Sequence, residues 1–550
     1  MAAPHQQHVA VASEPADVVG DEKQTLEASV VNNEDLAPSE SAVGTKSEVP
    51  KTSDGGIILI PQPSSDPCDP LNWSNSKKAT IVATLFLAMF VGFSAPFCGQ
   101  LNIQQQAALY GKTVVQITYF NSAASAGLAT GGYFWWPLSH KFGRSSVIFW
   151  TLFGQLAAQI WAPLMTKPDQ YAPYLVSRYF SAFFGVTVGV LGPRYLVDMY
   201  FLHQRGRAFT VLHLALNFGA SAGPTFAGFV AANNYWPVEY WWSVGLTGFA
   251  IIIVFLFLEE TSYDRTTEGA VNRTKPDSWI NDRVETFFPG SKVTPPTTWA
   301  HTLKLSITPF KIGIAPVLLI IAGFDTISFG FYVALNALTP VWLQLPARAG
   351  GIYGFNVTQN AAFTFIHWIG FIVGLVYGHY FSDRIPLWLA KRNKGVWKPE
   401  YRLHALWPTN FILMPLGLGL VGCAMQYRLH WFVMALAQFF VTIGSLVSIP
   451  VTVNYICECF RTHTTEATLV LNSMRLFLGL SINFYINDWI AAVGVGWVYG
   501  MQAFFSIVAY MFLVALMIWG HKIREITPFR TSESEEGQHV LAKGPEDHGF

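Results

Sequence analysis

Charged residues are scarce in this sequence. Asp, Glu, Lys and Arg together make up 12% of its 550 residues, against 51% hydrophobic and 15% aromatic residues. A soluble chain has about a quarter charged residues, so this composition excludes an ordinary water-soluble fold and favours a lipid environment. The formal net charge is zero, which provides no basic surface, and we therefore exclude a nucleic-acid partner.

Cysteines are few, and two common functional motifs are missing. The five cysteines are Cys68, Cys98, Cys423, Cys457 and Cys459. An odd number at scattered positions fits neither a disulfide framework nor a four-ligand zinc site. The sequence also lacks the Gly-x-x-x-x-Gly-Lys-Ser/Thr loop that binds ATP phosphates and the His-Glu-x-x-His zinc motif. We therefore expect a non-enzyme without a metal or another cofactor.

The two ends of the chain differ from its middle. Residues 1–76 combine Ser, Pro and Ala with an excess of acidic side chains, and residues 521–550 carry a polar run around residues 532–536. Such segments cannot bury enough apolar surface to fold, so we expect two solvated cytoplasmic tails. The first tail has no continuous apolar core like that of a signal peptide, so the first membrane helix is expected to direct insertion.

Long apolar stretches recur between the tails. Each has about twenty residues, the length that one helix needs to cross about 30 Å of hydrocarbon. We place twelve such spans near residues 79–99, 115–136, 146–165, 173–194, 208–230, 240–258, 312–335, 361–381, 404–425, 430–453, 467–487 and 496–519. The short alternating segments of a β-barrel are absent from the sequence, so we expect an all-α membrane protein.

Basic residues are concentrated in alternate connections between these spans. Lys and Arg near helix ends are retained on the cytoplasmic side of a membrane. One side holds Lys77, Lys78, Lys141, Arg144, Arg205, Arg207, Arg384, Lys391, Arg392, Lys394, Lys398, Arg402, Arg461, Lys522 and Arg524. The other side holds Lys112, Lys167, Arg348 and Arg428. Both termini are therefore expected in the cytoplasm, which requires an even number of crossings and agrees with twelve.

The longest internal connection divides the spans into two groups of six. We expect an N-terminal bundle over residues 77–258, a cytoplasmic linker loop over residues 259–308 and a C-terminal bundle over residues 309–520. Many transporters are built from repeated halves, with the substrate site near the membrane midplane. A chance fusion of two six-helix proteins would give the same pattern.

The connection after the second span contains a Gly-Arg pair, Gly143 and Arg144. Gly143 permits a tight turn with positive φ, and Arg144 can cap helix carbonyls or bind lipid headgroups. The segment resembles the loop motif of the major facilitator superfamily, in which Gly-Arg follows an acidic and a basic residue. Here Ser139 and His140 occupy those two places. The alternative is a plain cytoplasmic basic loop.

Arg178 lies inside the fourth span, ahead of several glycines. An unpaired guanidinium in hydrocarbon costs about 2.5 kcal/mol or more, so this side chain should face the bundle interior. The pattern resembles the arginine-then-glycine signature of the same superfamily, which implies a role in proton coupling. A structural arginine, bonded to backbone carbonyls near the outer interface, is the alternative.

The fifth span contains the sequence Asn-Phe-Gly-Ala-Ser-Ala-Gly-Pro-Thr-Phe-Ala-Gly at residues 217–228. Gly219, Gly223 and Gly228 lie on one helix face and permit close helix contact, while Pro224 removes a backbone hydrogen bond. The Gly-x-x-x-Gly-Pro arrangement resembles the antiporter signature of the drug:proton antiporter branch. This resemblance implies export in exchange for protons. A generic packing stripe would explain the glycines alone.

Flanking sequences extend the resemblance. Residues 69–74, 259–265 and 455–467 resemble those of fungal twelve-helix members of this branch, and the similarity covers about residues 66–530. It implies the major facilitator fold and a proton-coupled carrier that exports a drug, toxin or secondary metabolite by antiport. Two alternatives stay open: a proton symporter that imports a polyamine, cation or nutrient, and a non-transporting membrane receptor.

Few other ionisable residues lie inside the spans. Asp325 in the seventh span is the carboxylate expected nearest the middle of the membrane, where burial favours proton exchange during a cycle. It could instead pair with Arg475 of the eleventh span. His367 and His213 could titrate near neutral pH, although a membrane histidine is more often an interhelical hydrogen bonder. The candidate coupling residues are Arg178, Asp325, Arg475 and His367.

One glycosylation acceptor is expected on the outer side. Asn356 begins an Asn-x-Thr triplet between the seventh and eighth spans, whereas Asn72 and Asn272 begin triplets on the expected cytoplasmic side. The expected partners are a small organic substrate, protons and the lipid bilayer. We expect a monomeric multi-pass protein of the plasma membrane.

Overall fold

Every regular element formed by the described residues is a helix. The computed structural model describes residues 61, 63–64, 66–263, 278–288, 298–345, 352–393, 397–460 and 463–527. These residues all belong to one compact unit of the chain. The predicted tails before residue 61 and after residue 527, part of the linker 259–308, and the predicted loop residues Asn272, Arg348, Lys394 and Arg461 lie outside the described residues.

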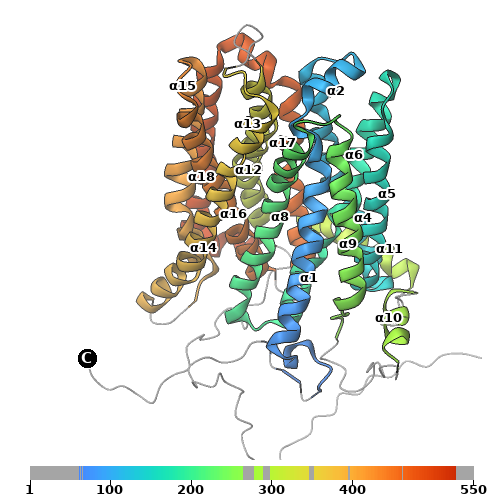
Figure 1. Cartoon of the computed structure of the whole chain (residues 1–550). Coiled ribbons are helices and arrows are strands. Elements are labelled where there is room, and N and C mark those ends of the chain that lie inside the picture. The colour runs from blue at the N-terminus through green and yellow to red at the C-terminus, as the bar shows by residue number, and fades with distance from the viewer. Residues whose placement is uncertain are drawn as a thin grey trace, which may run out of the picture. The chain divides into compact units, whose positions relative to one another are not determined.

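Six long helical segments come from the first half of the chain (Figure 1). They are α1 (Asn75–Ser94) with its 3₁₀ extension η2 (Ala95–Gln100), α4 (Tyr119–Phe142), α5 (Arg144–Trp161), α6 (Tyr171–Gly185) with α7 (Thr187–Met199), α8 (Leu202–Ala231) and α9 (Val238–Phe257). The shorter helices of this half are η1 (Pro70–Asn72), α2 (Ile103–Tyr110), α3 (Val114–Ile117), η3 (Ala162–Leu164) and η4 (Pro168–Gln170).

Six further segments come from the second half. They are α12 (Pro316–Gln344), α14 (Phe365–Arg392) with the short α13 (Val357–Phe363) before it, α15 (Met414–Gln426) preceded by η7 (Pro399–Leu406) and η8 (Trp407–Leu413), α16 (Trp431–Cys459), α17 (Thr464–Val493) and α18 (Val495–Ile526). In the segment that leads to α15, η7 is a 3₁₀-helix and η8 is a π-helix. Pro399 lies near the start of η7 and Pro408 near the start of η8. Both prolines lie in the first turn of their helix, where the missing N–H is not needed, and the regular α-helix begins at Met414.

Each predicted span coincides with one of these twelve segments. By length and composition, ten helical segments of the described residues could cross a membrane. The other two are α4, with 24 residues, and α8, with 30 residues. Both are long enough, but their many Gly, Ser, Thr and Asn residues make them less apolar than the other ten. Small residues in membrane helices are typical of close helix contacts.

The connection between the two groups is partly helical. It contains α10 (Trp279–Phe287) and the start of α11 (Trp299–Gly313). Ser146 and Trp150 of α5 each donate a hydrogen bond to the carbonyl oxygen of Phe287, both at 3.2 Å. Arg283 donates to the carbonyl oxygen of Leu258 at 2.7 Å. The α10 part of the linker is therefore attached to the first group of helices, whereas α11 packs against α4 of the first group and α17 of the second.

Two helices run past the domain boundaries expected from hydropathy. α11 continues to Gly313, beyond residue 308, and α18 continues to Ile526, beyond residue 520. Hydropathy detects only the apolar core of a helix, whereas the backbone hydrogen bonds that define a helix continue into the interface. The domain boundaries stay predictions.

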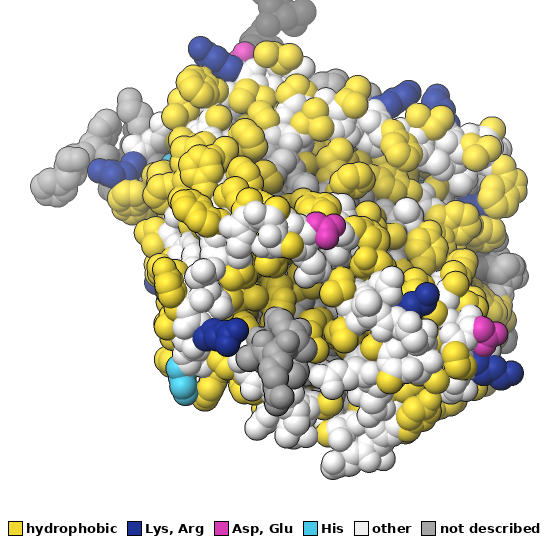
Figure 2. Space-filling model, turned by 90° about the horizontal axis from the view of Figure 1, so that it is seen from above, with side chains coloured by type: hydrophobic (Ala, Val, Ile, Leu, Met, Phe, Trp, Pro, Cys, Tyr) yellow, Lys and Arg dark blue, Asp and Glu magenta, His cyan; other side chains and the backbone are white. Residues whose placement is uncertain are grey.

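The two ends of the bundle differ in charge. The first and last described residues lie at the same end of the bundle, which we call the basic end (Figure 1). The opposite end, which contains α2 and α13, is called the far end. Figure 2 shows the far end as a mainly hydrophobic or uncharged surface on which Lys, Arg, Asp, Glu and His are isolated. The exposed bases Lys112, Lys167 and Arg428 lie in connections of that end. Which end faces the cytoplasm stays a prediction.

The halves meet along two pairs of helices. α4 packs against α17, and α8 packs against α13 and α14. Three polar contacts cross this interface toward the far end. Gln344 donates to the carbonyl oxygen of Leu101 at 2.6 Å, and Asn483 donates to the hydroxyl of Ser122 at 3.2 Å. The hydroxyls of Thr225 and Thr364 lie 2.5 Å apart. Side chains of both halves thus hold the far end together.

Candidate functional site

A central cavity lies between the two halves. Helices α1 with η2, α4, α7 and α8 line it from the first half, and α12 and α17 line it from the second. Protein atoms leave about 850 Å³ unfilled there, including the open side of the cavity. The part of this space that the centre of a water molecule can reach measures about 70 Å³, so the cavity is narrow in this conformation.

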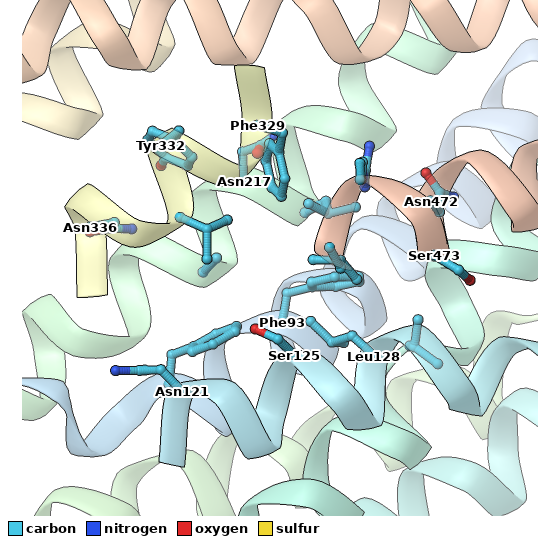
Figure 3. Close-up of a pocket in the computed structure, with 18 of the residues that line it drawn as sticks. Phe93, Asn121, Ser125, Leu128, Asn217, Phe329, Tyr332, Asn336, Asn472 and Ser473 are labelled. Atoms are coloured by element: carbon cyan, nitrogen blue, oxygen red, sulfur yellow. The ribbon is translucent and has the colours of Figure 1, made fainter. Parts of the chain in front are cut away.

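Half of the residues that line the cavity are neutral polar or aromatic, and most of the others are aliphatic (Figure 3). The polar ones are Gln100, Asn121, Ser125, Asn217, Tyr332, Asn336, Asn472 and Ser473, and the phenylalanines are Phe93, Phe97 and Phe329. In Figure 3, Phe329 and Tyr332 lie across the cavity from Ser125 and Leu128. Such a lining binds a ligand through aromatic contacts and a few directed hydrogen bonds.

Arg475 is the one charged side chain among the described residues that line the cavity. It is 3% exposed, and its guanidinium lies 5.0 Å from the ring centre of Phe329. Its Nε and Nη1 atoms have no hydrogen-bond partner, and no described residue forms an ion pair with it. A buried guanidinium is normally paired, so Arg475 is a candidate binding group.

Asp325 lies on α12 but is not part of the lining. Its Oδ2 atom accepts a hydrogen bond from Thr452 of α16 at 2.9 Å, and its Oδ1 atom has no hydrogen-bond partner. The side chain is 1% exposed. Asp325 and Arg475 interact electrostatically, yet they form no ion pair within 4.0 Å among the described residues. The pairing considered from the sequence is therefore not formed in this conformation.

The two membrane histidines have hydrogen-bond partners. Nδ1 of His367 on α14 lies 2.8 Å from the hydroxyl of Thr442 on α16, so this residue bridges two helices. Nδ1 of His213 lies 2.9 Å from the carbonyl oxygen of Phe209 in the same helix. Neither histidine lines the central cavity. Their positions suit structural roles, and a role of His367 in coupling stays a prediction.

Arg178 belongs to a second polar cluster, inside the first half toward the far end. Its guanidinium donates to the carbonyl oxygens of Ala95 at 3.2 Å and Ala158 at 3.4 Å, and it lies 4.7 Å from the ring centre of Tyr240. The side chain is fully buried and does not line the central cavity. This geometry matches the structural alternative weighed from the sequence, an arginine bonded to backbone carbonyls.

Sequence reasoning missed Glu239, the carboxylate of this second cluster. Its Oε1 atom accepts from Gln106 at 3.0 Å, and its Oε2 atom has no hydrogen-bond partner. The residue is fully buried near Arg178, although the predicted sixth span begins one residue later. Gly99 of η2 lies against the cluster, since a Cβ atom there would lie 2.9 Å from the hydroxyl of Tyr174. The cluster therefore packs against the segment that supplies Gln100 to the cavity.

The predicted Gly-Arg turn is present at the basic end. Gly143 has φ +89°, a conformation that favours glycine, and it separates α4 from α5. Arg144 forms an ion pair with Asp198 at the end of α7 and donates to the hydroxyl of Thr261 at 3.1 Å. Asp198 was not singled out from the sequence, because one acidic residue at a helix end is common. It supplies the negative charge that Ser139 cannot.

The glycines of the fifth span let α8 lie directly on α1. A Cβ atom at Gly219 would be 2.5 Å from the carbonyl oxygen of Phe90, and one at Gly223 would collide with that of Ser94. At Gly228 it would meet Leu101 of the same half and Ala361 of the other. Pro224 lies within the helix. The five residues from Gly219 also have the Gly-x-Ser-x-Gly spacing of hydrolases, but they lie inside a helix rather than in a strand-to-helix turn.

Asn356 is exposed at the far end, where it caps α13. Its side chain accepts a hydrogen bond from the backbone N–H of Gln359 at 2.7 Å, and the side chain of Gln359 accepts from the N–H of Asn356 at 3.0 Å. This reciprocal pair is a capping box. Asn356 therefore has a structural role, and its glycosylation stays a prediction.

A central cavity between two six-helix halves of a membrane-spanning bundle defines a polytopic membrane transporter. The chain belongs to the Major Facilitator Superfamily, because the model of that family matches residues 78–396, more than half of the sequence. The family and the fold class predicted from the sequence are therefore confirmed.

Two fungal proteins are similar over most of their length. The MFS-type transporter atr4 of Stereocaulon alpinum is 26% identical over 91% of this chain and 87% of its own. The efflux pump radE of Floropilus chiversii is 24% identical over 84% of each chain. Among solved structures, the proton:xylose symporter XylE has a similar fold, with a TM-score of 0.57 and 14% identity over 81% of this chain and 97% of its own.

Proposed function

We propose that this chain is a proton-coupled secondary active transporter that exports a small amphipathic organic molecule by antiport. The observation that carries the proposal is the polar and aromatic cavity enclosed by both six-helix halves. In transporters built from repeated halves, substrate binds at the interface between them, and rocking of one half against the other exposes the site to each side in turn.

Proton coupling is assigned to Asp325 and Arg475. Asp325 is a buried carboxylate with one oxygen free of hydrogen bonds, and Arg475 is a buried cation that lines the cavity. Because the two interact electrostatically, a proton on Asp325 changes the field at Arg475. Arg178 acts at a distance, by holding η2 through the carbonyl of Ala95.

Two observations support export. The glycines of α8 allow the close α1–α8 contact that the resemblance to antiporters implies. The relative radE is named an efflux pump, at 24% identity.

Flux in sealed inside-out membrane vesicles tests this proposal. A panel of labelled amphipathic acids, neutral compounds and amines would be offered at the outside, with the vesicle lumen acidified. We expect accumulation of at least one compound, abolished by a protonophore and by Asp325→Asn. Binding without flux across the whole panel would contradict transport and favour a receptor.

Proton symport is a second candidate, favoured by one specific observation. Arg475 lines the cavity without an ion-pair partner among the described residues, so an anion bound there would favour the protonated form of nearby Asp325, and anion and proton would bind together. In right-side-out vesicles an acidic outside would then drive accumulation. The same panel in the two vesicle orientations separates the candidates.

We further propose a monomer in the plasma membrane, with both termini in the cytoplasm and with bundles over residues 77–258 and 309–520. The distribution of bases between the basic end and the far end supports this orientation. Epitope tags at both ends should be accessible only after the membrane is permeabilised.

Glycosylation of Asn356 follows from the same topology. In a eukaryotic host, we expect Asn356→Gln to remove a mobility shift that is sensitive to glycosidase. Asn72→Gln should leave the shift unchanged, because Asn72 lies at the basic end. A mobility shift that depends on Asn72 would show that the basic end faces outward, opposite to the proposed topology.

A further inference from the structure

The charge on the lining of the central cavity is of one sign. Among the described residues that line it, Arg475 carries a positive charge and none is Asp or Glu. A cationic ligand would therefore meet a guanidinium and no carboxylate, whereas an anion would meet a charge of opposite sign. In a desolvated site, such a difference in charge controls which ligands bind.

Arg475 also has unused hydrogen-bond donors. Its Nε and Nη1 atoms are buried without an acceptor, although a guanidinium has a planar fork of donors that matches a carboxylate. The nearby acid, Asp325, has one oxygen bonded to Thr452 and forms no ion pair with Arg475. A planar oxyanion from outside the chain would satisfy donors that the described residues leave open.

Two asparagines that line the cavity each have an uncharged side-chain atom without a hydrogen-bond partner among the described residues. The Oδ1 atom of Asn121 on α4 accepts a hydrogen bond from Gln100 at 2.8 Å. The Nδ2 atom of the same side chain has no acceptor among the described residues. Oδ1 of Asn472 on α17 has no donor. Figure 3 shows Asn121 and Asn472 at separate places along the cavity. A ligand with a hydroxyl or carbonyl group beyond its acidic end could bond to them.

We propose that the cavity takes an organic acid, a molecule with a carboxylate and an apolar or aromatic body. The carboxylate binds Arg475, the body packs against Phe93 and Phe329, and polar substituents bond to Asn121 or Asn472. This inference rests on the proposed role of the cavity as the substrate site. It does not depend on the direction of transport.

Binding of three matched probes to the purified full-length protein in nanodiscs tests the inference. The probes are naphthalene-2-carboxylate, its neutral carboxamide and the cationic naphthylmethylammonium, which share one aromatic body. We expect the carboxylate to bind about tenfold or more tightly than the amide, because charge-assisted hydrogen bonds are roughly twice as strong as neutral ones. The ammonium probe should bind most weakly.

Variants assign this preference to Arg475. Arg475→Gln should abolish the preference for the carboxylate while amide binding persists, and Arg475→Lys should retain only part of it. Lys167→Gln, an exposed base at the far end, is the matched control and should change nothing. If Arg475→Gln fails to fold with Asp325 left uncompensated, the double variant Arg475→Gln, Asp325→Asn removes both charges and serves in its place.

Two results would overturn the inference: tighter binding of the ammonium probe than of the carboxylate, or a carboxylate preference that survives in both Arg475→Gln backgrounds. Flux measurements keep this failure apart from failure of the proposed function. If the acid binds in a way that depends on Arg475 but no compound is transported, the proposed transport function is contradicted and the organic-acid inference stands. Flux of neutral or cationic compounds that Arg475→Gln leaves intact contradicts the organic-acid assignment and the coupling role of Arg475, while transport itself stands.

Discussion

Two buried arginines show how contacts decide the role of a residue type. Arg178 donates to backbone carbonyls of η2 and α5, whereas Arg475 lines the cavity with unpaired donors. Both lie in apolar spans and look alike in the sequence. The first has satisfied bonds, which suits a structural role, and the second has unsatisfied ones, which suits ligand binding.

We expect Arg178→Gln to destabilise the protein. The shorter amide cannot reach both Ala95 and Ala158, and each buried group left without a bond costs about 1–3 kcal/mol. The check is the apparent melting midpoint in detergent, with Lys167→Gln as an exposed control. An unchanged midpoint together with a lost pH dependence of transport would instead assign Arg178 to proton coupling.

The ion pair of Arg144 and Asp198 is the second residue-scale test. Their side chains are 13% and 8% exposed, so removing one partner leaves the other charge partly buried. Breaking a buried pair costs about 3–5 kcal/mol, and Arg194, whose Nε atom lies 3.3 Å from Oδ1 of Asp198, offsets part of this loss in Arg144→Gln. We expect Arg144→Gln and Asp198→Asn each to lower stability, and the double variant to lose clearly less than the sum. Additive losses would show that the pair does not couple the two side chains.

At the scale of elements, the packing of α8 on α1 depends on missing side chains. The carbonyls of Phe90 and Ser94 occupy the space that Cβ atoms at Gly219 and Gly223 would need. Backbone atoms cannot move aside as the end of a flexible side chain can. The two helices must therefore separate if either glycine gains a methyl group.

We expect Gly223→Ala to reduce the yield of monodisperse protein and its melting midpoint. Gly248→Ala on α9 is the matched control, because nothing lies within 4 Å of a Cβ atom there. Alanine is favoured over glycine in a helix by about 1 kcal/mol, so the control should be neutral or slightly stabilising. Equal behaviour of the two variants in size-exclusion chromatography and melting would contradict the packing argument.

At the scale of the whole molecule, contacts between the halves close the far end. The paired hydroxyls of Thr225 and Thr364 join α8 to the residue that directly precedes α14, and Asn483 joins α17 to Ser122 of α4. Alternating access requires these contacts to break during each cycle. A covalent bond at the same place would hold the far end closed.

The double variant Thr225→Cys, Thr364→Cys should form a disulfide on mild oxidation. The hydroxyls are 2.5 Å apart, close to the distance between bonded sulfur atoms, about 2.05 Å. We expect the cross-link to stop flux and a reductant to restore it. Each single cysteine variant is a control for the native thiols. Full flux in the cross-linked protein would show that these contacts do not open during transport.

The sequence by itself determined the spans, the family and the special backbone positions. Apolar length is a local property, and so is the need for glycine at Gly143. It did not reveal Asp198, whose importance comes from its contact with Arg144, or Glu239, which lies next to the predicted edge of a span. Amides such as Asn121 and Asn472 in apolar spans could have suggested a polar cavity.

Only the tertiary structure decided which buried polar groups share a site. The sequence left open whether Asp325 pairs with Arg475, and in the described residues the two form no ion pair, while Arg178 lies in a separate cluster. The physical reason is that hydropathy gives the length of a helix but not its rotation, whereas a side chain's partners depend on the face that each helix turns toward its neighbours.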